Sequence, residues 1–470
     1  MSRENFEVLE LAGKFARTYR EEIHSKSPRP SATLASLRGA FGGPVPATGR
    51  PAARVLEELR LAAEPGLAGT TGGRFFAWVF GGSHPAGVAA DILTSAWGQN
   101  AALYLCSPAA AVAEEVAGAW LLELLALPKA CSVGFTSSAT TAIFTGLAAA
   151  RSEVLRKVGW DVERDGLAGA PPVTILLGEE AHTTVFAALQ YLGFGRSNLT
   201  TVESDGQGRI KSAAFERVLG KTSGPAIAIL QAGHIASGAF DPFAELVPMA
   251  QAKDAWVHVD GAFGLWARVS EKTRSLAEGV EAADSWAVDG HKWLQTPYDC
   301  GFAICRNPEA HRRAMLIAAS YLDAEGLGQF EPSHFVPELS RRGRGFAVWA
   351  VIKALGREGI AGIVDTSCRL ARKFAGLLST EPGVTVVNEV DLNQVCVAFG
   401  GGLSPAKSKA VTQLVIDRVL NGGVCFVQGA EWKGRWVMRL SLNAYQTNDE
   451  DVERSAAAII ACWREVRGVL

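Results

Sequence analysis

Short apolar runs alternate with helical periods from about residue 130 onward. The runs are "CSVGF" (131–135), "VTILL" (173–177), "AIAIL" (226–230), "AWVHV" (255–259), "SWAV" (285–288) and "GFAIC" (301–305). Several of them are apolar along their whole length, which is typical of strands covered by helices on both faces. After the first run, Ile143, Leu147, Ala150 and Val154 recur at helical spacing. The pattern predicts an α/β domain with a large, doubly wound, mostly parallel sheet.

The segments on either side have a different character. Residues 1–26 predict an amphipathic helix, and residues 27–51 are rich in Pro, Gly and Ser, which predicts an extended arm. We therefore expect a helical N-terminal arm over 1–70 that forms a dimer and a large α/β domain over 71–345.

The last part of the chain, 346–470, predicts a smaller α+β domain. A long helix follows "RRGRGFAVWAVIKALG", and strands are expected near "VTVVN", "QVCVAFG" and "WVMRLSL". The final helix opens at "TNDEDVERSAAAII", where Asn448 and Asp449 are candidate caps.

Composition narrows the class of protein. Of 470 residues, 48% are apolar and 20% charged, which is ordinary for a soluble globular protein. The net charge of -2 and the scattered basic residues favour no nucleic-acid partner. The charged N-terminus predicts no signal peptide, and the uncharged run 92–113 contains polar residues and Pro108, so we expect no membrane span. The eight dispersed cysteines predict reduced thiols, a cytoplasmic location and no metal site.

The ends of the predicted strands carry the candidate chemistry, because ligands of open α/β sheets lie outside the carboxyl ends of the strands. After the first strand, Ser138, Ala139 and Thr140 open a helix whose free N–H groups would hold a phosphate. The alternative is a plain N-cap. After the second strand comes His182, which is either a structural hydrogen-bonder or a flat ring that stacks on a planar cofactor.

Two further strand ends carry an acid and a lysine. Asp260 follows "AWVHV", and an acid there is costly to bury without a cation, although a helix cap or a salt bridge is the alternative. Lys292 follows "SWAVDGH", and a lysine in an apolar pocket can form a Schiff base, although pairing with Asp289 or Asp299 is the alternative. A phosphate site, a stacking ring, an acid for a pyridine nitrogen and a lysine for an aldehyde together indicate pyridoxal phosphate.

Longer motifs around these residues resemble a known family. "HVDGAFG" followed by "DSWAVDGHKWLQTPYDCG" is similar to the group II pyridoxal-dependent decarboxylases, which include aromatic-L-amino-acid and glutamate decarboxylases. The resemblance also covers "RFFAWVFGGSHPAG", "SSATTAIFTGLAAAR", "EEAHTTVFAALQYLG", "GAFDPF" and "ELSRRGRGFAVW", and so extends over nearly the whole chain.

The resemblance implies pyridoxal-phosphate fold type I, a homodimer formed through the N-terminal arm, and a set of site residues. It implies Lys292 as the Schiff-base lysine, Asp260 as the carboxylate for the pyridine nitrogen and His182 as the stacking histidine. The remaining residues that it implies for the cofactor are Ser138, Ala139, Thr140, Ala262 and His291.

One departure from the family concerns the loop before "SRR". Aromatic decarboxylases carry a proton-donating tyrosine there, and this chain has Phe330 or Pro332 at that place. Tyr321 lies upstream, and His334 is the nearest other proton carrier, so His334 is our candidate donor. In the family, loss of this tyrosine goes with aldehyde-forming oxidative deamination.

The expected function is decarboxylation of an L-amino acid to its amine and carbon dioxide. Trp78 and Phe80 lie in the segment that lines the side-chain pocket of the aromatic enzymes, which favours an aromatic substrate, unless the segment is simply core. Arg342 and Arg344 would bind an acidic substrate or form salt bridges between subunits. Aldehyde formation, other lyase chemistry at Cα and a non-catalytic dimeric binding module stay open as alternatives.

Overall fold

The structure is a computed structural model, and it describes residues 4–317 and 329–468. Packing divides the chain into two compact units. The large unit comprises residues 83–372 and 387–396, and the small unit comprises 1–82, 373–386 and 397–470. The domain boundaries expected at 70 and 345 stay a prediction about the organisation of the chain.

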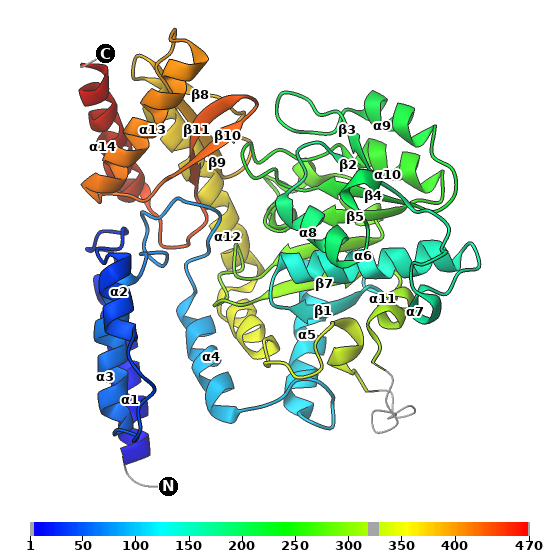
Figure 1. Ribbon diagram of the computed structural model, residues 1–470, viewed down its shortest axis with the longest axis horizontal. Helices are drawn as coiled ribbons and strands as arrows, with labels where there is room; N and C mark the ends of the chain where they lie inside the picture. Colours follow the sequence, from blue (N-terminus) through cyan, green and yellow to red (C-terminus); the bar gives the residue numbers. More distant parts are fainter. Residues whose placement is uncertain (1–3, 318–328, 469–470) are drawn as a thin grey trace. The chain divides into compact units, whose positions relative to one another are not determined.

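The large unit contains a seven-stranded sheet in the order β1-β7-β6-β5-β4-β2-β3 (Figure 1). Its strands are β1 (Ser132–Thr136), β2 (Thr174–Gly178), β3 (Leu199–Val202), β4 (Ala226–Gln231), β5 (Trp256–Asp260), β6 (Ser285–Asp289) and β7 (Gly301–Cys305). Only β7 runs antiparallel to its neighbours, β1 and β6. The predicted mostly parallel α/β sheet is confirmed, and β3 is the strand that the apolar pattern missed, because only its last residue is buried.

Helices α5 (Pro108–Leu124), α6 (Ala139–Arg156), α9 (Ser212–Leu219), α10 (Phe243–Gln251) and α11 (Pro308–Met315) contact this sheet. The other helices of this part of the chain are α4 (Pro85–Trp97), α7 (Val162–Asp165), α8 (Thr183–Tyr191) and α12 (Gly345–Ser379). Short 3-10 turns include η3 (Gly264–Val269) and η6 (Pro332–Phe335). The expected apolar face of α6 is buried, with Ile143, Leu147 and Ala150 at 0% exposure.

Strand alternation decides which side chains face α6. On β5, His258 faces this helix, because a Cβ on Gly146 of α6 would lie 2.8 Å from the His258 ring. Ser285 of β6 lies on the same face and is 2.8 Å from His258 Nδ1. Since side chains two residues apart share a face, Asp260 and Asp289, which end β5 and β6, also lie on the α6 side of the sheet.

A buried ion pair connects the segment before α12 to the sheet. Arg341 lies 2.9 Å from Glu114 of α5, and both side chains are 1% exposed. Arg341 also donates to the carbonyl oxygens of Ala101 and of Phe135, which belongs to β1. Burial raises the pKa of Glu114 against the opposing charge of Arg341. The arginine therefore joins three separate segments through one guanidinium.

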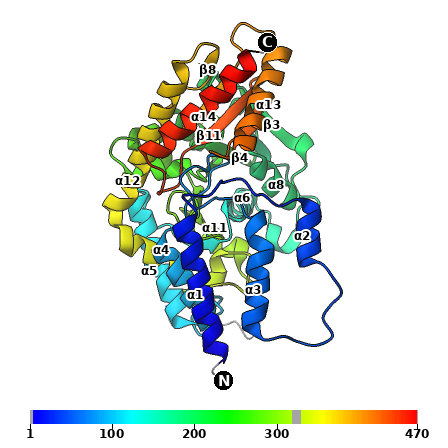
Figure 2. The same cartoon turned by 90° about the vertical axis from the view of Figure 1, so that its left-hand side faces the viewer.

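The small unit combines N-terminal helices with a four-stranded sheet in the order β10-β11-β9-β8. Its elements are α1 (Glu4–Glu22), α2 (Leu34–Phe41), α3 (Ala52–Ala63), β8 (Val384–Val386), β9 (Gln394–Phe399), α13 (Pro405–Gly422), β10 (Gln428–Trp432), β11 (Arg435–Ser441) and α14 (Asp449–Arg467), and the first residues of β9 belong to the large unit. Helices α1 and α3 lie side by side (Figure 2).

Two local predictions in this unit have clear outcomes. The extended arm predicted over 27–51 is wrong in part, because Thr33 and Ser36 form a capping box that starts α2. The Asn448 cap is confirmed, since its side chain accepts the Asp451 N–H at 2.9 Å. Asp449 is instead the first residue of α14, where an acid favours the helix dipole.

The Arg341–Glu114 pair predicts a large effect on stability. We expect Arg341→Ala to lower the free energy of unfolding by about 3–5 kcal/mol, because it leaves a buried carboxylate without its cation. Arg342→Ala serves as the control: it removes a half-exposed pair with Asp91 and should cost about 1 kcal/mol or less. Denaturant unfolding of both variants measures the difference, and equal losses would contradict the assignment.

Candidate active site

Four segments predicted from the sequence meet at the carboxyl ends of the strands of the large sheet. The start of α6 is tied to the end of β6, because the Ala139 N–H donates to Asp289 Oδ1 at 2.6 Å. The other oxygen of this carboxylate, Oδ2, lies 3.1 Å from Lys292 Nζ. Burial raises the pKa of Asp260 at the end of β5, and nearby His182 and Lys292 lower it. The structure therefore brings the phosphate segment, the lysine, the acid and the histidine together.

The segment expected to hold a phosphate begins α6. Ser138 occupies the N-cap position, and its side chain makes no capping hydrogen bond, so the alternative of a side-chain cap is not what the structure shows. Strand β7 passes very close to this segment, because a Cβ on Gly301 would lie 2.5 Å from the Ser138 carbonyl carbon. Backbone N–H groups at a helix start attract anions, and the glycine lets the strand approach them.

His182 is the N-cap of α8. Its Nδ1 lies 2.7 Å from Thr184 Oγ1 and accepts the Thr184 N–H at 3.4 Å. The structural hydrogen-bonding alternative for His182 is thus present. The same bonds fix the plane of the ring, which a stacking role also needs.

Asp260 is 5% exposed and accepts the Ala262 N–H at 3.2 Å. Burial raises its pKa, against the lowering effect of nearby His182 and Lys292. A buried carboxylate is stable as an anion only beside positive charge. Asp260 is therefore suited to face a cationic group that the site would hold.

Lys292 lies between a carboxylate and an aromatic ring. Its Nζ pairs with Asp289 and stands 5.6 Å from the centre of the Phe263 ring. The ion-pair alternative from the sequence is thus realised with Asp289. Asp299 pairs with Arg344 instead, at 2.9 Å.

His291 has a defined protonation pattern. Its Nδ1 accepts the Cys300 N–H at 3.2 Å, so the ring proton lies on Nε2, which is 3.4 Å from Asp289 Oδ1. Burial lowers the pKa of His291, which keeps the ring neutral. His291 is therefore a donor toward Asp289.

Tyr298 is a neighbour of this cluster that the sequence did not reveal. Its ring stacks on His291 with centroids 4.2 Å apart, and it is 52% exposed. Only the return of the chain from β6 into antiparallel β7 brings it to His291, so no local signal would have found it.

Other predicted residues lie elsewhere. His334 is on η6, and this turn packs against β1 and α11 and donates the Ser333 N–H to the Ala102 carbonyl. Tyr321 lies outside the described residues. Arg342 pairs with Asp91 at 2.6 Å and Arg344 pairs with Asp299, which is the ion-pair alternative, formed within the chain.

Trp78 and Phe80 belong to the small unit. Their rings stack with centroids 5.4 Å apart and join Phe75 and Phe426 in one aromatic cluster. Phe76 is 1% exposed and Trp78 is 43% exposed. The segment is therefore partly core, as the alternative held, while the Trp78 ring stays accessible.

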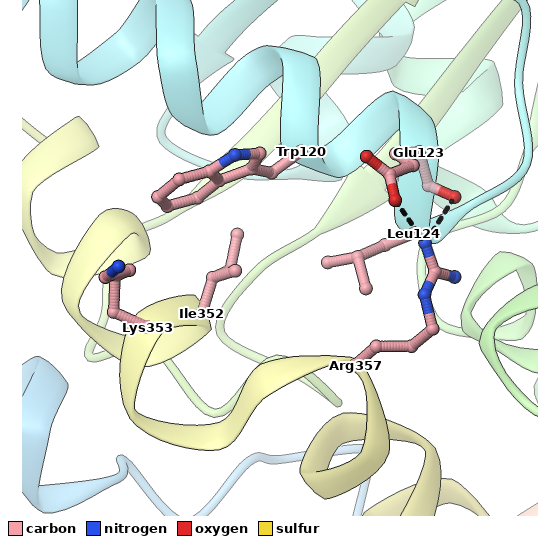
Figure 3. Close-up of a pocket in the computed structure, with 6 residues that line it drawn as sticks. All are labelled: Trp120, Glu123, Leu124, Ile352, Lys353 and Arg357. Carbon is pink, nitrogen blue, oxygen red and sulfur yellow. Dashed lines mark hydrogen bonds and ion pairs between the residues drawn. The ribbon is translucent and has the colours of Figure 1, made fainter.

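Cavity size alone does not locate the chemistry. A cavity of about 230 Å³ opens between α5 and α12 (Figure 3), and its lining residues are Trp120, Glu123, Leu124, Ile352, Lys353 and Arg357. Another of about 290 Å³ lies in the small unit beside Gly400, Gly401 and Gly402. A third, of about 10 Å³, reaches Asp260. Neither of the two larger cavities is lined by a predicted site residue.

All eight cysteines are free thiols. Within residues 4–317 and 329–468, no cluster of three His, Cys, Asp or Glu side chains is placed to hold a metal ion. In the same described ranges no helix is both long and apolar enough to cross a membrane.

Comparison with known proteins indicates one protein family. The profile described as "Pyridoxal-dependent decarboxylase conserved domain" matches residues 40–399. An aromatic-L-amino-acid decarboxylase of Bacillus atrophaeus is 27% identical over 91% of this chain and 89% of its own length. A 4-hydroxyphenylacetaldehyde synthase of Rhodiola rosea is 23% identical over 94% of this chain and 91% of its own length.

Solved structures agree in fold. A crystal structure of Oryza sativa TDC with PLP and tryptamine superposes with a TM-score of 0.92 at 22% identity, covering 99% of this chain and 98% of that chain. At this identity the match concerns the fold of the chain. It covers both compact units.

The close approach of β7 to the start of α6 can be tested with a glycine substitution. We expect Gly301→Ala to lower the free energy of unfolding by about 1–3 kcal/mol, because the added Cβ meets backbone atoms of Ser138 that cannot turn away. Gly362→Ala on α12 is the matched control, since its Cβ has nothing within 4 Å, and it should be neutral or slightly stabilising. If the two variants unfold alike, the close approach does not exist.

Proposed function

The chain belongs to the pyridoxal-dependent decarboxylase family, and from this premise we propose a role for each residue of its site. The protein is a pyridoxal-phosphate-dependent amino-acid decarboxylase of fold type I, as the resemblance implied. Its substrate is an amino acid, and the reaction is that of a carboxy-lyase. The convergence of Lys292, Asp260 and the α6 N-terminus at one sheet edge supports the roles below.

The residues at this edge fit the cofactor. Lys292 would hold its aldehyde carbon, and the buried Asp260 carboxylate would keep a positive charge on its ring nitrogen. His182 and Ala262 would contact the ring. The phosphate would lie at the α6 N-terminus beside Ser138, Ala139 and Thr140, where the Ala139 N–H itself is donated to Asp289, with His291 close by. When bound, pyridoxal phosphate supplies the electron sink that accepts the electron pair as carbon dioxide leaves.

The protein residues supply orientation and charge. Low polarity around Asp260 strengthens its attraction for a cation, so the proton on a partner nitrogen is held more firmly than in water. Thr184 holds His182 in one orientation. Phe263 shields one side of Lys292, which limits the access of water to the amine.

The substrate proposed is an aromatic L-amino acid, converted to its amine. Support comes from the aromatic decarboxylases among the relatives, and Trp78 and Phe80 are the residues that we propose for contact with the aromatic side chain. Arg342 and Arg344 are already engaged by Asp91 and Asp299, which disfavours an acidic substrate. His334 is the proposed proton donor because of its place in the sequence before "SRR", although its turn η6 packs against β1 and α11 and not with the residues that meet at the strand ends.

A homodimer and a cytoplasmic location complete the proposal. Helix α4 exposes Ile92 (53%), Leu93 (47%) and Trp97 (50%), and α1 exposes Leu9 (61%), so apolar area is left for a second copy to cover. Eight free thiols suit a reducing compartment.

A mixture of amino acids with mass spectrometry of the products tests this function. We expect the amine of an aromatic amino acid together with carbon dioxide. An aldehyde with hydrogen peroxide would favour the aldehyde-forming alternative. Absence of any product from a cofactor-loaded protein would favour the non-catalytic binding module.

Lys292→Ala tests the lysine assignment. The variant should stay folded, bind pyridoxal phosphate more weakly and lose turnover, because the amine beside Asp289 is gone. Lys353→Ala, which removes an exposed lysine of the cavity between α5 and α12, is the control and should keep its activity. Retained activity in Lys292→Ala would move the role to another lysine.

Asp260→Asn tests the acid. The amide keeps the size and the Ala262 hydrogen bond but carries no charge, so we expect a loss of about 10²-fold or more in kcat. Cofactor content, measured by visible absorbance, should stay near that of the parent. A near-normal kcat would mean that Asp260 has only a structural role.

His334→Phe tests the proton donor. In this variant amine formation should slow more than carbon dioxide release, because protonation of the carbon that lost its carboxylate is slower. The aldehyde side product should therefore increase. Tyr321→Phe is the comparison and should have the smaller effect. An unchanged ratio of amine to carbon dioxide in both variants would exclude both donors.

A further inference from the structure

Asp289 contacts both the start of α6 and Lys292. Three donors converge on its carboxylate: the Ala139 N–H at 2.6 Å and His291 Nε2 at 3.4 Å reach Oδ1, and Lys292 Nζ at 3.1 Å reaches Oδ2. The side chain is 5% exposed. Its own N–H donates to the Ala262 carbonyl at 2.9 Å, beside Asp260. A single residue thus contacts the phosphate segment, the lysine and the ring-contact segment.

The two carboxylate oxygens have different partners. Oδ1 holds the first N–H of α6 and the neutral His291 ring, and these contacts need only a hydrogen-bond acceptor. Oδ2 faces the Lys292 amine, and this contact needs a negative charge to be strong. An asparagine at this position would keep the first set of contacts and lose the second.

The charge on Asp289 has a further consequence. A hydroxyl or an amide would satisfy the Ala139 N–H with less repulsion toward a bound phosphate, so a helix cap alone does not explain a carboxylate here. The carboxylate is explained by the lysine, because only an anion balances a mostly buried ammonium. The other titratable groups around it are Asp260 on β5 and Tyr298 and Cys300 on the turn to β7.

We propose that Asp289 is a positioning residue that couples the two ends of the cofactor site, with Oδ1 holding the phosphate segment in place and Oδ2 holding and charging the Lys292 amine. The proposal rests on the proposed role of Lys292. It assigns Asp289 no contact with substrate.

Asp289→Asn and Asp289→Ala separate the two halves of the proposal, with Asp299→Asn as the control, since Asp299 is the adjacent acid that pairs with Arg344. Cofactor-free protein is titrated with pyridoxal phosphate at equilibrium. The rate of association is then measured as a function of pH by visible absorbance.

Asp289→Asn should bind pyridoxal phosphate within about 3-fold of the parent, because the amide oxygen still accepts the Ala139 N–H. Its association rate should reach the plateau about one pH unit lower, because the amine loses its counter-charge and is neutral at a lower pH. Asp289→Ala should show the same pH change and bind about 10-fold more weakly, since the phosphate segment is no longer held. Asp299→Asn should match the parent in both measurements.

Two results would overturn the proposal. An unshifted pH profile in Asp289→Asn removes the link to Lys292, and this test stands even if the alanine variant does not fold. Equal affinity losses in the asparagine and alanine variants remove the role of Oδ1. Failure of the Lys292 assignment looks different: borohydride would then fix pyridoxal phosphate to another lysine in the parent protein itself.

Discussion

Two carboxylates buried at neighbouring strand ends are the constraint on which the site depends. Asp260 and Asp289 end β5 and β6 on the face covered by α6, where an anion is unfavourable without positive charge or hydrogen-bond donors. The start of α6, Lys292 and His291 supply them to Asp289. Asp260 accepts one backbone N–H, and nearby His182 and Lys292 lower its pKa against the effect of burial. A protonated cofactor ring would supply the positive charge that the buried Asp260 carboxylate needs.

The scaffold around this edge keeps these groups in register. His258 and Ser285 pack beneath α6 and fix the helix against β5 and β6. Burial lowers the pKa of His258 to about 3, so the ring adds no charge to the core. Arg341 holds β1 to the segment before α12. Movement of α6 relative to the strands would therefore break packing contacts and buried hydrogen bonds. These contacts keep the start of α6 and Lys292 at a fixed separation.

Much of this arrangement follows from the sequence. Short apolar runs predict six of the seven strands in the large unit, and the rule about strand ends selects Ser138, His182, Asp260 and Lys292. The apolar pattern and the rule about strand ends do not reveal the following features. Strand β3 lacks an apolar run, α2 depends on a capping box within a Pro- and Gly-rich segment, and Tyr298 reaches His291 only through the antiparallel return of β7. Asp289 was visible as a partner of the lysine, but its bond to Ala139 depends on how α6 sits on the sheet.

Reductive trapping tests the central claim most directly. The purified, cofactor-loaded protein is treated with borohydride, digested and mapped by mass spectrometry for the lysine that carries the pyridoxyl group. The account predicts loss of the visible absorbance band and a single modified peptide that contains Lys292. A label on any other lysine, or a visible band that survives the treatment with no labelled peptide, would contradict it.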